Sequence, residues 1–436
     1  MNVAIIGGGW AGIAAAVTLA GKADVTLFEA GRTLGGRARK ITRVNTRGAA
    51  LDNGQHILLG AYRETLALMR TIGAAPETRL RRLPLRIQDA SGFRLALPRL
   101  PHPFNLLFGF LGARNTGMGE KLATARWMRA LKARRFAVPP EADSSVQEWL
   151  DAAGQNGVLR RHLWEPLCLA ALNTPAERAS ARVFARVLQE SLGNSAPGAT
   201  DLLLPRVSLS DLLPEPARYW LEQRGATIRM RERVRALRPL DGRWQVASER
   251  GLEKTFDKLI LAVAPWHLPP LLAALPRADF PAPPQAAEPI VTLYLDYPPR
   301  RAALPYPLLA LSGKHGGWLV EREQGALAIA LSGRGAWEEL TDEALATALH
   351  NDIARYFPRL AALPPYQVIR EKRATFSCRP RLPRCPQETP WPGLFIAGDH
   401  NLPDYPATLE SAVRSGQNSA RSCLDARANP TPTPPT

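Results

Sequence analysis

Residues 3–12 read Val3-Ala4-Ile5-Ile6-Gly7-Gly8-Gly9-Trp10-Ala11-Gly12, and this stretch decides the fold. The apolar run at its start predicts a β-strand, and the alanine-rich residues 14–20 predict a helix. A second apolar run, residues 25–28, predicts another strand that ends at Glu29. A strand, a glycine turn, a helix and a strand closed by an acidic residue form the βαβ unit that binds the diphosphate and ribose of a dinucleotide.

Each glycine of this motif has a separate physical role. Gly7 permits the tight turn after the strand, Gly9 leaves room for the diphosphate beside the backbone, and Gly12 lets helix and strand pack closely. Trp10 and Ala11 lie between the glycines and the predicted helix, whose N-terminus offers unpaired N–H groups and a partial positive charge that favour an anion. We therefore expect all five residues to belong to the cofactor site.

The residues after the second strand indicate which dinucleotide is bound. Glu29 and Ala30 are expected beside the ribose, and the carboxylate would repel the 2′-phosphate of NADP. The following Gly35-Gly36-Arg37 resembles the corresponding segment of the flavoprotein amine oxidase and carotenoid desaturase superfamily. The resemblance implies bound FAD rather than NAD, with Gly36 beside the cofactor and Arg37 on its diphosphate. A solvated loop arginine is the alternative for Arg37.

The C-terminal part of the chain resembles the same superfamily. Residues 393–399 are an apolar strand that ends in Gly398-Asp399, and residues 406–416 predict a helix. The resemblance implies that Asp399 lies by the ribityl chain and diphosphate of FAD. It also implies that the helix N-terminus, at Thr408 and Leu409, faces the pyrimidine edge of the flavin, where it stabilises negative charge. A turn aspartate that caps the helix is the alternative for Asp399.

A third segment of this kind lies in the middle of the chain. Residues 231–237 and 244–246 predict a hairpin of strands, and residues 258–265 predict a strand followed by Ala264-Pro265. The resemblance implies that Val234 meets the adenine of FAD through its backbone atoms. An ordinary strand valine is the alternative.

The string Asp52-Asn53-Gly54-Gln55-His56 supplies the candidate catalytic residues. In the superfamily this position passes over the flavin ring, which implies close approach at Gly54 and places Gln55 and His56 beside the ring. Imidazole titrates near neutral pH, so His56 is a candidate proton donor. A structural or exposed histidine is the alternative.

Further strings narrow the resemblance. Together with residues 52–56, the strings Leu172-Asn173-Thr174-Pro175, Asp201-Leu202-Leu203-Leu204-Pro205-Arg206 and Ala397-Gly398-Asp399 are similar to the hydroxysqualene dehydroxylases of bacterial hopanoid pathways. The resemblance implies reductive conversion of hydroxysqualene, an apolar C30 isoprenoid, to squalene. It also implies an external reductant such as NADPH and an upstream squalene-pathway enzyme as partner. A phytoene-type desaturase and an amine oxidase remain the alternatives.

The cysteines form no CxxC pair and predict neither a disulfide framework nor a metal site; they are Cys168, Cys378, Cys385 and Cys423. None lies between residues 398 and 416, where covalent monoamine oxidases carry the thiol that links their flavin, so the resemblance implies non-covalent FAD. Reduced thiols, and a first strand that leaves no room for a signal peptide, predict a cytoplasmic protein.

The net charge of +17 raises the question of an anionic partner. No nucleic-acid-binding motif accompanies the charge, so we expect no nucleic acid. No apolar run reaches the ~18 residues that cross a bilayer, but residues 104–111 are strongly apolar and a basic segment, residues 126–135, follows. This combination predicts peripheral contact with the anionic inner face of a bacterial membrane. A buried core helix is the alternative for residues 104–111.

These segments predict an α/β fold in which a Rossmann-like FAD-binding domain carries an inserted α+β substrate domain, as in amine oxidases. The FAD-binding domain is predicted to be discontinuous, with residues 1–75, 200–275 and 380–425, and residues 76–199 and 276–379 form the substrate domain. Within the substrate domain, residues 106–195 predict helices, and further elements are expected as strands at 290–295, 317–320 and 327–331 and a helix at 341–356. Residues 426–436, rich in proline and threonine, predict a disordered tail.

Overall fold

The first strand lies in the middle of a five-stranded parallel sheet. The computed structural model describes residues 1–44, 46, 48–89, 91–298, 302–311, 313–322 and 326–425, so the predicted tail 426–436 lies outside the described residues. The strand order of the sheet is β10-β2-β1-β14-β20, with β10 (Thr227–Met230), β2 (Asp24–Glu29), β1 (Asn2–Ile6), β14 (Lys258–Leu261) and β20 (Leu394–Ile396). Because all strands run parallel, their carboxyl ends share one edge, where open α/β sheets bind ligands.

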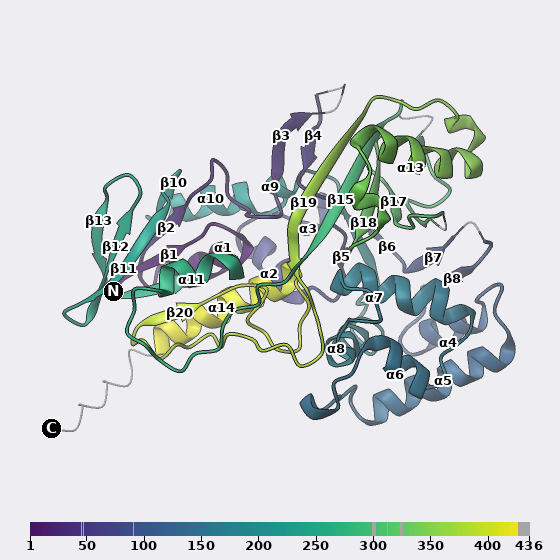
Figure 1. Cartoon of the computed structure of the whole chain (residues 1–436), viewed down its shortest axis with the longest axis horizontal. Coiled ribbons are helices and arrows are strands. Elements are labelled where there is room, and N and C mark those ends of the chain that lie inside the picture. Colours follow the sequence, from purple (N-terminus) through teal and green to yellow (C-terminus); the bar gives the residue numbers. More distant parts are fainter. Residues whose placement is uncertain are drawn as a thin grey trace.

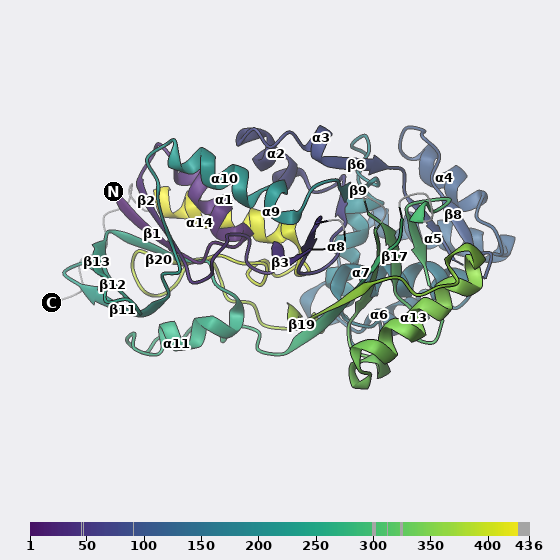
Figure 2. The same ribbon diagram turned by 90° about the horizontal axis from the view of Figure 1, so that it is seen from above.

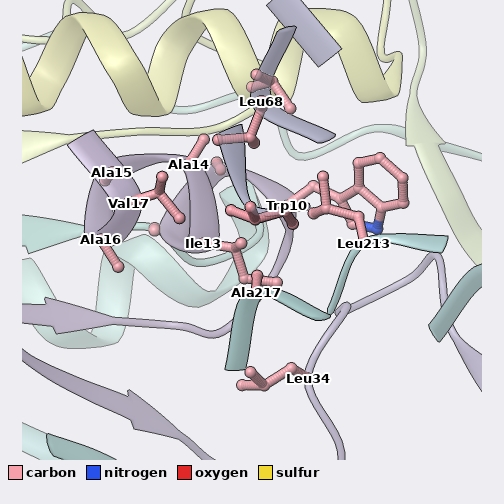
Figure 3. Packing of buried hydrophobic residues seen from close by; sticks show 14 of the residues in the cluster. Trp10, Ile13, Ala14, Ala15, Ala16, Val17, Leu34, Leu68, Leu213 and Ala217 are labelled. Carbon is pink, nitrogen blue, oxygen red and sulfur yellow. The ribbon is translucent and has the colours of Figure 1, made fainter. Parts of the chain in front are cut away.

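Helix α1 (Trp10–Leu19) packs on this sheet and is almost wholly buried. Figure 3 shows Trp10, Ile13 and Val17 of this helix among the side chains of neighbouring elements, which include Leu213 and Ala217. The small residues of α1 admit a second helix, α14 (Leu409–Asp425), at close range (Figure 1). Also packed here are α2 (Arg63–Thr71), α9 (Leu209–Leu212) and α10 (Pro214–Glu222).

Both predicted cofactor helices exist, but their starts differ from the prediction. Helix α1 begins four residues early, at Trp10, because Gly9 already accepts a helical hydrogen bond from the N–H of Ile13. Helix α14 begins at Leu409 instead of residue 406, because the Thr408 hydroxyl accepts a hydrogen bond from the N–H of Ser411 and so caps the helix.

A second, antiparallel sheet forms the other half of the molecule. Its strand order is β16-β17-β18-β15-β19, with β16 (Leu308–Ala310), β17 (Trp318–Glu321), β18 (Ala326–Ser332), β15 (Ala287–Asp296) and β19 (Tyr366–Phe376). Helix α13 (Asp342–Tyr356) covers one face of this sheet (Figure 2), and the hydroxyl of Thr341 caps its N-terminus. The three strands predicted between residues 290 and 331 are confirmed, whereas the sequence reasoning missed β16 and β19.

Residues 104–191 are mostly helical, as predicted. The helices are α4 (Phe104–Leu111), α5 (Met118–Ala133), α6 (Val146–Ala152), the π-helix η2 (Arg160–Trp164), α7 (Glu165–Leu172) and α8 (Ala181–Ser191). Their shared core contains Trp127, Trp164 and Phe184. Helix α4, however, is not a buried core helix: Phe104, Leu107, Phe108 and Leu111 are all exposed.

The predicted strand over residues 231–237 is wrong at its start. Strand β10 ends at Met230, and Arg231 adopts a left-handed backbone with φ of 56°. This bend turns the chain from the parallel sheet into a separate three-stranded sheet, β11 (Val234–Leu240), β12 (Arg243–Ser248) and β13 (Glu253–Phe256).

The remaining strands and short helices connect the two halves. The strands are β3 (Lys40–Val44), β4 (Ala50–Asp52), β5 (Leu58–Leu59), β6 (Leu80–Leu83), β7 (Arg86–Gln88), β8 (Arg94–Ala96) and β9 (Leu202–Pro205). The short helices are α3 (Pro76–Arg79) and α11 (Leu268–Leu272), with 3₁₀ turns at η1 (Pro140–Ala142), η3 (Pro265–His267), η5 (Ala336–Glu339) and η6 (Pro358–Leu360). Strand β9 pairs with both β5 and β6 and so links segments that are far apart in the sequence.

Candidate active site

One cavity of about 1350 Å³ is lined by both halves of the molecule. Its wall includes the carboxyl ends of β1 and β2 on one side and residues of α7, β7 and β17 on the other, which Figure 1 places far apart along the long axis. Single-ligand pockets usually measure about 300–1,000 Å³. The cavity is therefore large enough for a dinucleotide and a second ligand together.

The structure brings the predicted site residues to this one cavity. Those that line it are Gly7, Gly9, Trp10, Ala11, Glu29, Ala30, Gly36, Arg37, Gly54, Gln55, His56, Val234, Gly398, Asp399, Thr408 and Leu409. Gly12 does not line the cavity and instead lies against the turn: a Cβ atom there would stand 1.9 Å from the carbonyl oxygen of Gly7. Gly7 itself has φ of 110°, a conformation that only glycine adopts readily.

Glu29 is held in place by the backbone around it. One carboxylate oxygen accepts from the N–H of Gly8 at 2.8 Å, and the other accepts from the N–H of Gly31 at 2.6 Å. A carboxylate can accept further hydrogen bonds, so these contacts orient Glu29 without exhausting it. Its place at the end of β2 is the one from which the acidic residue of a βαβ fingerprint reaches a ribose.

Arg37 and Asp399 form an ion pair between the N-terminal and C-terminal segments. One nitrogen of the Arg37 guanidinium lies 2.9 Å from both carboxylate oxygens, and another donates to the carbonyl of Ala374. Burial alone would raise the pKa of Asp399, but Arg37 and His400 hold this pKa well below its usual value. Asp399 is therefore a buried anion, and the cap of α14 is Thr408.

His56 presents one ring nitrogen for proton exchange. Its Nδ1 lies 3.0 Å from the carbonyl oxygen of Gly54, and because a carbonyl only accepts, Nδ1 carries the hydrogen and Nε2 is the nitrogen that can gain or lose a proton. Burial lowers the pKa of His56 below its ordinary value, although Gly54 and Asp52 oppose that shift. The neutral imidazole is thus favoured near pH 7.

Gln55 is fixed at both ends of its side-chain amide. Its Oε1 accepts from Arg322 at 2.9 Å, and its Nε2 donates to the backbone carbonyl of His56 at 2.9 Å. The backbone N–H of Gln55 also lies 3.3 Å from the hydroxyl of Thr292 on β15. The loop between β4 and β5 is therefore tied to the antiparallel sheet.

The string at residues 172–175 has a structural explanation. Asn173 ends α7 in a left-handed conformation with φ of 49°. Its buried amide donates to Thr375 on β19 and accepts from the N–H of Gly333 at 2.6 Å, while Thr174 accepts from the N–H of Cys378. These contacts join α7, which lines the cavity, to the antiparallel sheet.

The sequence comparisons agree with this geometry. The sequence profile of the family described as flavin containing amine oxidoreductase matches residues 10–424. The chain belongs to this family. Among its relatives, the hydroxysqualene dehydroxylase of Rhodopseudomonas palustris is 30% identical, with coverage of 96% of this chain and 97% of the relative. The hydroxysqualene dehydroxylase of Zymomonas mobilis is 28% identical, and the alignment covers 95% of this chain and 97% of that relative.

The fold has solved counterparts as well. Cyclohexylamine oxidase from Brevibacterium oxydans has a TM-score of 0.67 and 17% identity, with coverage of 98% of this chain and 99% of the other. The predicted α/β fold of the flavin amine oxidase type is thus confirmed, and the protein is a FAD-dependent oxidoreductase.

The residues around the turn fit the diphosphate of FAD. Gly9 faces open space. Within the described part of the chain, a Cβ atom at Gly9 would have only the Cα of Gly36 within reach, at 4.0 Å, whereas a Cβ atom at Gly36 would stand 3.2 Å from the Cα of Gly9. The N-termini of α1 and α14 both reach the cavity and offer partial positive charge. The four cysteines, all within the described residues, are buried free thiols outside the cavity lining, which fits non-covalent FAD. No cluster of metal-ligating side chains occurs in the described part of the chain.

Sequence reasoning missed the contributions of β19 and η3 to the site. Arg370, Lys372 and Arg373 of β19 line the cavity, and Arg373 and Arg37 both lie over the ring of Trp266, at 5.7 and 5.3 Å. The basic residues of β19 have the composition of a solvated surface, and only the pairing of β19 with β15 brings them to the cofactor. A signal existed only at Trp266, which directly follows Ala264-Pro265.

Proposed function

We propose that this protein removes the allylic hydroxyl of hydroxysqualene reductively and releases squalene and water. The observation that carries the proposal is the continuity of the cavity, which joins the FAD fingerprint to apolar walls with His56 and Gln55 on the loop between them. When bound and reduced, FAD supplies the hydride that replaces the hydroxyl. The two relatives named hydroxysqualene dehydroxylase, similar along almost their whole length, support this choice of substrate.

His56 supplies the proton in this proposal. The C–O bond breaks as the hydroxyl takes a proton from Nε2 of His56, and the carbon is left with an allylic, delocalised positive charge that accepts the hydride. Nδ1 stays bound to the carbonyl of Gly54, which holds the ring in one orientation. A neutral His56 then regains its proton from solvent between turnovers. The proton and the hydride balance the loss of water.

The apolar walls suit the C30 hydrocarbon. They come from the β4–β5 loop, β5, β7, β9, β16, β17, α7 and α8, and their side chains are Ile57, Leu59, Leu85, Ile87, Leu167, Ala170, Ala171, Val187, Leu202, Leu308, Trp318 and Val320. A site for a molecule with one polar group needs few polar contacts. Gln55 provides one, because Nε2 has a second hydrogen besides the one given to His56, and this hydrogen is free to orient the substrate hydroxyl.

Anaerobic single turnover tests the proposal directly. The purified holoprotein is reduced chemically and mixed with hydroxysqualene in detergent. We expect one squalene per flavin reoxidised, and NADPH tested as the physiological reductant should allow repeated turnover. Consumption of phytoene or of an amine by the oxidised holoprotein, without squalene formation, would contradict the proposal and favour the desaturase or oxidase alternative.

We also propose that the protein works at the anionic inner face of a bacterial membrane. Among the described residues, no helix has the length and apolarity required to cross a bilayer. Most of the large exposed apolar side chains instead gather between residues 100 and 122, on α4, α5 and the segments beside them; they are Leu100, Phe104, Leu107, Phe108, Leu111, Met118 and Leu122. Exposed apolar patches of this kind are uncommon on proteins that contact only water.

The charge around this patch matches an anionic lipid surface. Residues 99–136 contain eight lysines and arginines but a single acidic residue, Glu120, whose carboxylate is bound to the N–H of Leu159. Helices α4 and α5 lie at one end of the molecule, opposite the β11–β13 sheet, and α4 packs next to β8 (Figure 1). This end also carries β7, which lines the apolar part of the cavity.

Vesicle sedimentation tests the membrane proposal. We expect the holoprotein to sediment with phosphatidylglycerol-containing vesicles and not with vesicles of pure phosphatidylcholine. The double change Phe104→Ser and Phe108→Ser should weaken vesicle binding at least tenfold, because each phenyl group contributes about 1.5–3 kcal/mol when it is buried. Tyr219→Ser is the matched control, since Tyr219 is exposed on α10. Unchanged binding by the double variant would contradict the proposed surface.

A further inference from the structure

Arg322 lies behind the wall of the active site and holds its two polar neighbours together. Its guanidinium donates to Oε1 of Gln55 at 2.9 Å and to Oδ2 of Asp52 at 3.1 Å. It also lies over the ring of Tyr294, 5.3 Å from the ring centre. Neither Arg322 nor Asp52 lines the cavity, so neither contacts a ligand there directly.

Asp52 fixes Arg322 in turn. The Asp52 side chain is 2% exposed and that of Arg322 is 16% exposed, so water screens this pair only weakly. The other carboxylate oxygen of Asp52 accepts from the N–H of Leu209 at 2.8 Å, and the backbone carbonyl of Asp52 accepts from the hydroxyl of Tyr294 at 3.1 Å. With its carboxylate held on both sides, Asp52 gives the guanidinium one preferred position.

The consequence is a defined orientation of the Gln55 amide. The two ends of a glutamine amide have similar size, and only their hydrogen-bond partners distinguish them. The guanidinium of Arg322 has only hydrogen-bond donors, so the end of the Gln55 amide that faces it must be the acceptor, Oε1. The NH₂ group at the other end then lies beside the backbone carbonyl of His56. Loss of Arg322 would allow the amide to rotate and present an acceptor in place of a donor.

We propose that Arg322, anchored by Asp52, is a positioning residue that keeps the Gln55 NH₂ group directed at the substrate hydroxyl. This inference rests on the proposed function for the identity of that hydroxyl. The arrangement joins the loop between β4 and β5, which carries Gln55 and His56, to Arg322, the residue that directly follows β17. The two halves of the molecule therefore meet at this contact.

The experiment is a double-mutant cycle between Arg322 and Gln55. Arg322→Lys keeps the positive charge beside Asp52 but not the planar fork that reaches two acceptors, so the variant should fold. We expect Arg322→Lys and Gln55→Leu each to lower kcat at least tenfold with little change in KM, and the double variant to be no slower than Gln55→Leu alone. Arg81→Met is the control and should leave kcat unchanged, because Arg81 forms a half-exposed ion pair with Glu321, the last residue of β17 and the neighbour of Arg322.

A second readout needs no substrate. Hydrogen exchange of the FAD-loaded protein should become faster in the peptide that contains residues 52–57 in Arg322→Lys, and not in Arg81→Met. The positioning role would be overturned if the losses of kcat in Arg322→Lys and Gln55→Leu multiplied in the double variant. It would also be overturned if hydrogen exchange in the peptide of residues 52–57 were unchanged in Arg322→Lys. If the wild-type protein formed no squalene at all, the proposed function would fail while the exchange measurement still decided whether Arg322 holds the loop.

Discussion

The contact between α1 and α14 places two helix N-termini at the cavity, and Gly416 makes this contact possible. A Cβ atom at Gly416 would stand 2.0 Å from the carbonyl oxygen of Ala11 and 2.9 Å from its carbonyl carbon. Non-bonded carbon and oxygen atoms rest about 3.3–3.6 Å apart, so Gly416→Ala forces the two helix backbones apart by more than about 1 Å. The obstacle is backbone on both sides, and no side chain can rotate away to relieve it.

Two opposing effects determine how far Gly416→Ala changes the free energy of unfolding. Alanine favours a helix over glycine by roughly 0.5–1 kcal/mol. Overpacking typically costs about 1–3 kcal/mol, and this close backbone contact belongs at the upper end of that range. We therefore expect a net loss of about 1–2 kcal/mol in the free energy of unfolding. Because Ala11, Thr408 and Leu409 line the cavity, FAD should also bind more weakly, and a displacement of about 1 Å can lower kcat roughly a hundredfold.

Thermal unfolding and the ratio of flavin to protein measure this effect. Gly119→Ala is the matched control, since Gly119 lies within α5 and a Cβ atom there would meet nothing within 4 Å. The control should be stabilised by about 0.5–1 kcal/mol, so that the same substitution has opposite signs at the two positions. A Gly416→Ala variant with full FAD content and unchanged or higher stability would refute the reasoning.

Three other predictions concern the site itself. Burial lowers the pKa of His56 from its ordinary value of about 6.5, so the protonated form is lost as the pH rises through a value below 6.5. We therefore expect kcat/KM to increase as the pH falls from 8 towards 6. A flat pH profile, or a profile that is unchanged in His56→Gln, would exclude His56 as the proton donor. Asp399→Asn removes the charge that pairs with Arg37 and should lower the flavin content of the purified protein, measured by absorbance; full flavin loading would argue that the pair is only structural. Asn173→Ala leaves the buried N–H of Gly333 without its acceptor and should lower the free energy of unfolding, measured by chemical denaturation, by about 1–3 kcal/mol; an unchanged stability would contradict the anchoring role of Asn173.

The part of the site built from local sequence could be predicted in advance. The residues of the glycine turn, Glu29 and the start of α14 are fixed by steric and hydrogen-bonding rules that act over a few residues, and the structure places them at one cavity. Local rules also explain the small errors. The alanine pattern marks the middle of α1 but not the cap at Gly9. The error at Arg231 has a distant cause instead, because the N–H of Arg231 binds the carbonyl of Gly31, which is far away in the sequence.

Residues whose role depends on distant contacts could not be predicted. Arg322 is one of 56 lysines and arginines, and nothing near it in the sequence separates it from a solvated arginine. Its partner Asp52 lies 270 residues away, and the place of β17 in the antiparallel sheet brings Arg322, the residue after this strand, to the loop after β4. The same holds for β19, whose charged residues lie beside the cofactor segments only because the strand pairs with β15.

The charges around His56 suggest how cofactor loading and proton donation are linked. Arg37 lowers the pKa of His56, whereas Asp52 raises it. Arg37 lies in the segment that faces the FAD diphosphate, whose negative charges would offset the guanidinium and so shift the pKa of His56 upward. The negative charge of Asp52 is already paired with the guanidinium of Arg322, so Asp52 can compensate little of the positive charge of Arg37. Burial remains the largest cause that lowers the pKa of His56, and FAD would offset only the smaller contribution of Arg37.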